Sequence, residues 1–65
     1  MNMKDIENQV EMIRLAAGDD EIAHTLEDSL MVEFIEYVAT LKLPIGIKAR
    51  KVLETRRIDF ARWCA

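Results

Sequence analysis

The chain has 65 residues, of which 51% are hydrophobic, and a formal net charge of -3 at pH 7. A single cysteine, Cys64, excludes an intrachain disulfide, and with the single histidine, His24, it supplies too few ligands for a structural zinc site. The apolar runs are too short to cross a bilayer, and acidic residues interrupt the first turns where a signal peptide would be basic and apolar. We therefore expect one small domain over residues 1–65, located in the cytoplasm.

Charge is divided unevenly along the chain. Residues 1–41 carry ten anions and two cations, a net charge of -8, whereas residues 42–65 carry seven cations and two anions, a net charge of +5. Three arrangements would explain this division: an acidic helix paired with a basic segment in one fold, head-to-tail association of copies, or a basic surface for nucleic acid. A chain of this length buries only about 60% of the surface that it exposes when unfolded, so we expect self-association, most simply as a dimer.

The first predicted element is an amphipathic helix. Apolar residues recur at steps of three and four in Met3, Ile6, Val10, Ile13 and Ala17, and charged residues occupy the other positions. Gly18 is expected to adopt the left-handed conformation that ends such a helix. Asp19 or Asp20 is expected to cap the next helix.

The second predicted helix spans residues 20–41 and is the longest element, because Pro44 disfavours helical geometry at the preceding residue. From Leu30 onward, apolar side chains cover most of its circumference. Such a wide apolar arc must be covered from two directions, which predicts that this helix is the central element.

A third, shorter helix is predicted over residues 46–55, after a connector at residues 43–46, and residues 58–65 are expected to add a short final turn. The fold class is all-α. Two long helices should form an antiparallel hairpin, closed by the short third helix and by a docked C-terminal segment.

This docking follows from the pattern on the second helix. At about 100° per residue, acidic residues in its first half fall on the same side as apolar residues in its second half. The C-terminal segment carries apolar and basic residues that would match both parts. The predicted interaction set comprises Glu27, Asp28, Met31, Ile35, Val38, Ile58, Phe60, Arg62 and Trp63.

His24 and its acidic neighbours are the weak candidates for a metal site. Asp20, Glu27 and Asp28 stand at helical spacing from His24, and an imidazole with carboxylates can bind a divalent cation or support proton transfer. One helix rarely supplies enough converging ligands. We therefore favour a structural interpretation, in which His24 is a helix-surface residue and Glu27 or Asp28 pairs with an arginine, and we predict no metal and no cofactor.

The basic third of the chain is the candidate nucleic-acid surface. Its cations could contact phosphates, and aromatic rings near the C-terminus could stack on bases. The acidic net charge opposes non-specific binding of nucleic acid, so this interpretation ranks second. The cations concerned are Lys48, Arg50, Lys51, Arg56 and Arg57.

Two stretches of the chain resemble small uncharacterised proteins encoded by bacteriophages and prophages. The first covers residues 17–39, with Gly18-Asp19-Asp20-Glu21, Ala23-His24, Glu27-Asp28-Ser29-Leu30, Phe34 and Tyr37-Val38-Ala39. The second includes Val52-Leu53, Thr55 and the C-terminal sequence from Ile58 to Ala65. The resemblance implies a bacterial host cytoplasm and a role in the interplay of phage and host. It carries over no activity and no functional residue.

The sequence contains no recognisable catalytic or cofactor motif, and it has more apolar residues than so short a chain can bury. We therefore expect a non-enzymatic interaction protein, a phage or prophage accessory factor that binds a host or phage protein. A nucleic-acid-associated module is the alternative. A metal-dependent hydrolase that uses the His24 cluster across a dimer is the third choice.

Overall fold

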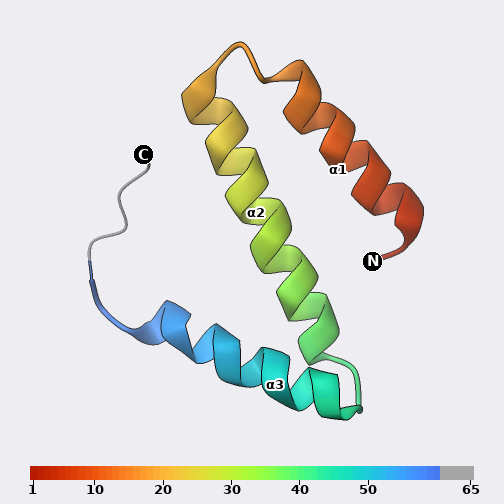
Figure 1. The fold of residues 1–65 in the computed structure, drawn as a ribbon, viewed down its shortest axis with the longest axis vertical. Helices are drawn as coiled ribbons and strands as arrows, with labels where there is room; N and C mark the ends of the chain where they lie inside the picture. The colour runs from red at the N-terminus through yellow and green to blue at the C-terminus, as the bar shows by residue number, and fades with distance from the viewer. Residues whose placement is uncertain (61–65) are drawn as a thin grey trace.

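A computed structural model of the protein describes residues 1–60. Its helices are α1 (Met3–Leu15), α2 (Asp20–Ala39) and α3 (Pro44–Leu53), and a short 3-10 helix, η1 (Glu54–Arg57), follows α3 directly. Helices α1 and α2 form an antiparallel hairpin, and α3 turns back from the C-terminal end of α2 on the side away from α1 (Figure 1). The predicted all-α class, with a helical hairpin and a third helix, is confirmed.

Helix α1 begins at a reciprocal cap. The Asn2 side chain accepts a hydrogen bond of 2.8 Å from the backbone N–H of Asp5, and the Asp5 carboxylate accepts one of 3.0 Å from the backbone N–H of Asn2. The predicted left-handed Gly18 is wrong, because no residue among 1–60 has a positive φ. The helix ends instead with Ala16 in the right-handed region, where its N–H still reaches the Met12 and Ile13 carbonyls.

Helix α2 begins after Asp19, whose carboxylate accepts a 3.1 Å hydrogen bond from the backbone N–H of Ile22. This confirms one of the two predicted caps. The helix ends at Ala39, two residues before the predicted end at Leu41. At this end the Thr40 hydroxyl donates a 2.6 Å hydrogen bond to the Tyr37 carbonyl, which then no longer requires a partner from the next turn.

Helix α3 begins at Pro44, two residues earlier than predicted. Proline is well suited to the first position of a helix, because its φ is already helical and the N–H that it lacks would have no partner there. The helix ends at Leu53 and tightens into η1, so the predicted helical span to Thr55 is divided between two elements. Residues 58–60 lie outside the helices, and the rest of the predicted final turn, residues 61–65, falls outside the described residues.

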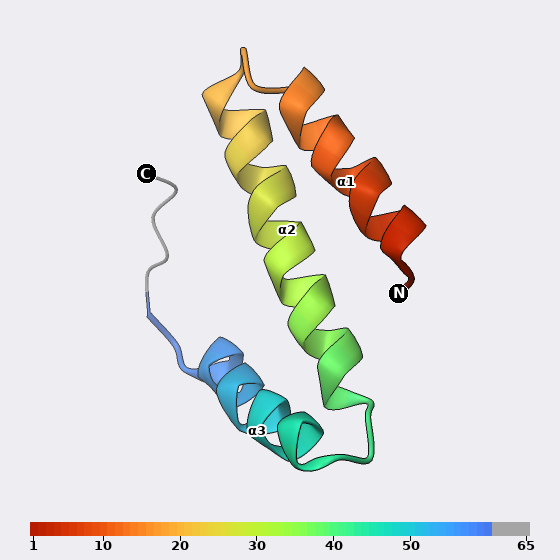
Figure 2. The ribbon, with the colours of Figure 1, turned by 45° about the vertical axis from the view of Figure 1, so that its right-hand side comes forward.

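The three helices lie in a single layer. Helices α1 and α3 each pack on α2 and make no contact with each other, which confirms α2 as the central element. The molecule extends over 38 × 33 × 10 Å, and a second helical layer would add about 8–10 Å to the smallest dimension. Figures 1 and 2 show α1 and α2 side by side, with α3 leading away from the end of α2 at an angle, and none of the described helices packs above or below another. Domains ordinarily have two packed layers around one core.

The single layer leaves the described part of the chain without a closed core. Within residues 1–60, only Gly46 and Ala49 are buried. The radius of gyration is 13.6 Å, whereas a compact domain of this length would have a value of about 11 Å. Large apolar side chains on all three helices and in the connecting segments are exposed: Met3, Val10, Met12, Leu15, Ile22, Met31, Phe34, Tyr37, Leu43, Ile45, Ile47, Val52, Ile58 and Phe60.

Candidate protein-binding face

The corner between α2 and α3 is held by close backbone contact. Gly46 lies so near the end of α2 that a Cβ atom would overlap the carbonyl oxygen of Leu41 and would lie 3.1 Å from that of Val38. Ala49, one turn further along α3, is the other buried residue. Small residues at this spacing let α3 approach α2 closely, so the corner fixes the position of α3.

Arg50 makes a further connection at this corner. Its guanidinium donates a hydrogen bond to the backbone carbonyl of Ala39, the last residue of α2. The last turn of α2 contains no basic residue of its own. Arg50 therefore brings positive charge to the negative end of the helix dipole and also satisfies a terminal carbonyl.

An apolar groove runs between α2 and α3. It has a volume of about 360 Å³, and its lining is almost entirely apolar apart from one lysine. Three of its side chains are roughly half exposed: Phe34 at 46%, Ile45 at 53% and Val52 at 54%. The complete lining, here called the apolar groove, is Phe34, Ile35, Val38, Ile45, Lys48, Ala49 and Val52.

Met31 extends this groove along α2. It precedes Phe34 by three residues and Ile35 by four, so the three side chains are neighbours on the helix surface. The Met31 side chain is 57% exposed. We call the apolar groove together with Met31 the apolar face.

The opposite face of α2 is polar. At about 100° per residue, Thr25, Ser29 and Glu36 lie roughly 180° around the helix from Phe34 and Val38. These three residues line a separate hollow, which Asp28, Val32, Glu33 and Arg56 complete. The central helix therefore separates an apolar face from a polar one.

The predicted interaction set is brought together only in part. Ile35 and Val38 do lie in the apolar groove, with Met31 beside it, but α3 packs there. Ile58 and Phe60 remain 57% and 54% exposed, and both views show residues 58–60 leading away from the end of the last helix (Figures 1 and 2). The other two members that were expected to dock, Arg62 and Trp63, fall outside the described residues.

The acidic half of α2 contains one close contact between a histidine and a carboxylate. His24 Nε2 lies 3.2 Å from Asp28 Oδ2, and the Asp28 side chain is 63% exposed. The predicted pairing of Glu27 or Asp28 with an arginine is not seen among residues 1–60, although Arg56 borders the same hollow as Asp28. In this part of the chain no three histidine, cysteine or acidic residues are grouped so that they could hold a metal ion, and Asp20 and Glu27 do not join the His24 pair.

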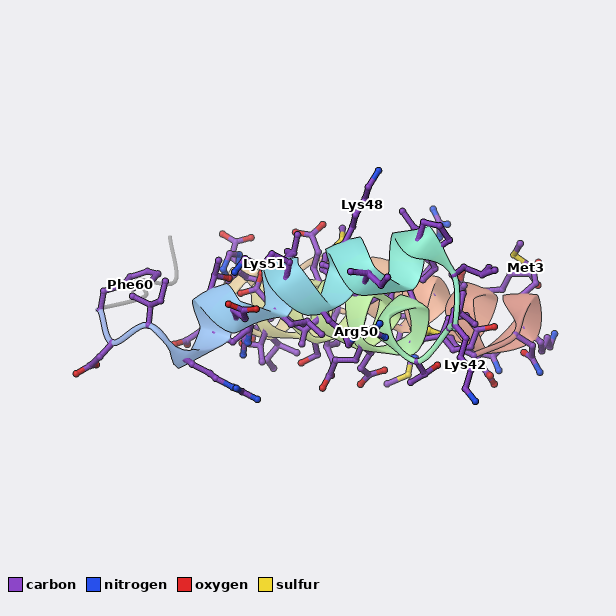
Figure 3. All side chains as sticks on the ribbon, turned by 90° about the horizontal axis from the view of Figure 1, so that it is seen from below. Met3, Lys42, Lys48, Arg50, Lys51 and Phe60 are labelled. Atoms are coloured by element: carbon purple, nitrogen blue, oxygen red, sulfur yellow. The ribbon has the colours of Figure 1, made fainter. Side chains whose placement is uncertain are left out.

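The five predicted phosphate contacts do not share one surface. Lys48 lines the apolar groove, whereas Arg56 borders the polar hollow. Arg50 and Arg57 border a third hollow with Leu53 and Glu54, and Lys51 lies 3.1 Å from the Glu54 carboxylate. In Figure 3, Lys48 extends from one side of the layer and Lys42 from the other.

Sequence reasoning missed the residues that shape the groove from its second side. Ile45 and Val52 lie on α3, and Phe34 faces them from α2. Two small residues three positions apart, Gly46 and Ala49, were the available signal of a close helix contact. The interpretation of residues 43–46 as a connector hid this signal, because it placed Gly46 at the start of the helix.

Over residues 1–60, none of the helices combines the length and the apolar character that a membrane span requires. Comparison of the chain with protein-family models, with curated proteins and with solved structures gave no match.

Proposed function

We propose that this is a non-enzymatic interaction protein that binds other protein surfaces through its apolar face. The observation that carries the proposal is the exposure of Met31, Phe34, Ile45 and Val52 around one groove in a molecule that is one helix thick. Contiguous apolar surface of this kind marks interaction sites on soluble proteins. Apart from the Lys48 ammonium, the groove supplies contact area and no titratable group.

The accessible surface supports the same proposal. It measures 5539 Å², whereas a compact monomer of 7.5 kDa would expose roughly 4,200 Å². The excess, on the order of 1,000 Å², is comparable with the ~800 Å² that each partner buries in a standard protein interface. A protein partner, including a second copy of the chain, would remove that excess from water.

The biological setting of the proposal is a bacterial cytoplasm. The resemblance of residues 17–39 and of the C-terminal sequence to small phage and prophage proteins supports a role as an accessory factor that binds a host or phage protein. In this setting the apolar face provides the affinity. The charged side chains around it determine the specificity for one partner over another.

Nucleic-acid binding is the weaker alternative. A phosphate-binding surface needs several cations on one side of the molecule. Of the five candidates, however, one borders the apolar groove, one the polar hollow and two a third hollow, and Lys51 is paired with Glu54. The third choice, a metal-dependent hydrolase across a dimer, has in its favour only the His24–Asp28 pair.

Affinity recovery from a bacterial lysate, with and without nuclease, tests the proposal. The bait proteins are the wild type, Phe34→Glu on the apolar face and Ser29→Glu on the polar face, so that the two variants add the same charge to the same helix. We expect one protein to be retained in fixed stoichiometry by the wild type and by Ser29→Glu, to resist nuclease, and to be lost from Phe34→Glu. Recovery that disappears after nuclease treatment, or that is equal for all three baits, would contradict the proposal.

A further inference from the structure

We infer that the occupant of the apolar face is a second copy of this chain, packed face to face with the two α2 helices antiparallel. This inference rests on the proposed function, because it uses the same face, and it goes further by naming the partner and its orientation. The resulting assembly is a two-layer bundle. The two apolar grooves become its core.

The shape of the protomer favours this occupant. The protomer extends over 38 × 33 Å in the plane of its helices and is only 10 Å thick, so one side of the layer can supply the ~800 Å² per partner that a standard interface buries. A second copy brings an equally flat face with the same apolar residues, so both copies lose their exposed apolar surface in one step. It also supplies the second layer that the single chain lacks, which is how small domains without disulfides or metals commonly become stable.

The charge pattern along α2 selects the antiparallel orientation. Asp20, Glu27 and Phe34 follow one another at seven-residue steps, so they share one line along the helix that changes from acidic to apolar. Beside the apolar end of this line stands a basic residue, Lys48, in the lining of the apolar groove. Each protomer thus presents an acidic end, an apolar centre and a basic end on the same face.

A two-fold axis across α2, near Met31 and Phe34, reverses the direction of the second copy. It brings Glu27 of one protomer toward Lys48 of the other, and the symmetry repeats this pair on the other side of the axis. Both protomers then keep their apolar centres in contact. An axis parallel to α2 would instead bring each Glu27 toward its own counterpart, and the repulsion between like charges disfavours it.

Sedimentation equilibrium on the purified protein tests the location of the interface. We expect a dimer for the wild type and for Ser29→Glu, and an increase of at least about tenfold in the dissociation constant for Phe34→Glu, because a charge would be buried against the second copy. Circular dichroism of each variant at high concentration checks that it remains helical. A wild type that is monomeric throughout the micromolar range, or a dimer that Phe34→Glu leaves unchanged, would overturn the inference.

Charge reversal tests the orientation. Glu27→Lys and Lys48→Glu should each raise the dissociation constant about three- to tenfold at low salt. Each change disrupts both symmetry-related Glu27–Lys48 pairs, and exposed ion pairs of this kind contribute little individually. The double variant should return close to the wild-type value, because each reversed charge meets a reversed partner across the two-fold axis. If the single changes are neutral, or if the double change adds their effects, the antiparallel orientation is wrong.

The two proposals fail in different ways. A monomer whose Phe34 face still captures a defined protein from the lysate would end the inference of a second copy and leave the proposed function standing. A dimer that dissociates on Phe34→Glu, but binds no other protein, would support the second copy and restrict the function to self-association.

Discussion

The two glycines of the chain have different structural roles. A Cβ atom at Gly46 would overlap the backbone of α2, whereas a Cβ atom at Gly18 would meet nothing within 4 Å, and neither residue has a positive φ. Gly46 is therefore required for close approach of two backbones. Gly18 is an ordinary turn residue whose flexibility only adds entropy to the unfolded chain.

This difference predicts opposite effects of the same substitution. Gly46→Ala should destabilise the fold by about 1–3 kcal/mol, the usual cost of overpacking, because the overlapping atoms are backbone and cannot move aside. Gly18→Ala should be neutral or stabilising by up to about 1 kcal/mol. Urea unfolding followed by circular dichroism measures both variants, and equal midpoints would refute the close contact.

The cap of α2 is a second prediction at the residue scale. Asp19→Ala removes the acceptor of the Ile22 N–H and should cost about 1 kcal/mol. Asp19→Asn keeps a side-chain oxygen at the same place and should retain most of the stability. Thermal unfolding at matched protein concentration compares the two variants. A loss in Asp19→Asn as large as that in Asp19→Ala would show that charge, and not the hydrogen bond, is what stabilises the helix start.

At the scale of elements, α3 stabilises the end of α2. Helix α2 has acidic residues in its first turn and no basic residue in its last turn. Its own side chains therefore offset the helix dipole only at the N-terminal end. Arg50 supplies the missing charge from α3. One side chain thus couples the two helices at the corner where the backbones also touch.

The coupling predicts unequal effects of two neighbouring substitutions. Arg50→Met should cost about 1–2 kcal/mol, because it removes a charged hydrogen bond to a helix-terminal carbonyl. Lys51→Met removes an exposed pair with Glu54, in which the lysine side chain is 78% exposed, and should cost less than about 0.5 kcal/mol. Chemical unfolding of both variants measures the difference. Equal costs would mean that the Arg50 contact contributes nothing beyond surface charge.

Element boundaries show how local chemistry modifies a periodic pattern. The periodicity of Met3, Ile6, Val10 and Ile13 predicted α1, and the apolar arc after Leu30 predicted a central α2. The ends were less accurate. Thr40 ends α2 by satisfying a carbonyl of the last turn, and Pro44 opens α3 although proline was taken as part of a connector.

At the scale of the whole molecule, the dominant feature is the single layer. Hydrophobic stabilisation requires that apolar surface be removed from water. Three helices in one layer bury only the surface along which neighbouring helices are in contact. Self-association would turn the remaining apolar surface into a core. The stability of the fold is then linked to the concentration of the protein.

This linkage predicts concentration-dependent melting. The Tm of the wild type should rise with protein concentration, because the second copy binds the folded state only. The Tm of Phe34→Glu should be lower than that of the wild type at every concentration, because its dimer is weaker. Differential scanning calorimetry over a hundredfold concentration range measures both. A wild-type Tm that stays constant over this range would contradict a core shared between two copies.

The sequence by itself determined the local features of this protein. Helix periodicity, a cap at Asp19 or Asp20, and the wide apolar arc of α2 depend on residues a few positions apart, which a sequence displays directly. The division of charge between acidic residues 1–41 and basic residues 42–65 is also visible in the sequence.

Only the tertiary structure decided which apolar residues would be covered and which would stay exposed. That outcome depends on the direction in which α3 leaves α2, and this direction is set by the backbone contact of Gly46 with Leu41 and by the hydrogen bond of Arg50 to Ala39. The candidate site therefore lies in the groove between α2 and α3, whereas the sequence predicted a site formed by α2 and the C-terminal segment. Periodicity shows which face of a helix is apolar, whereas the partner of that face is chosen by contacts between residues distant along the chain.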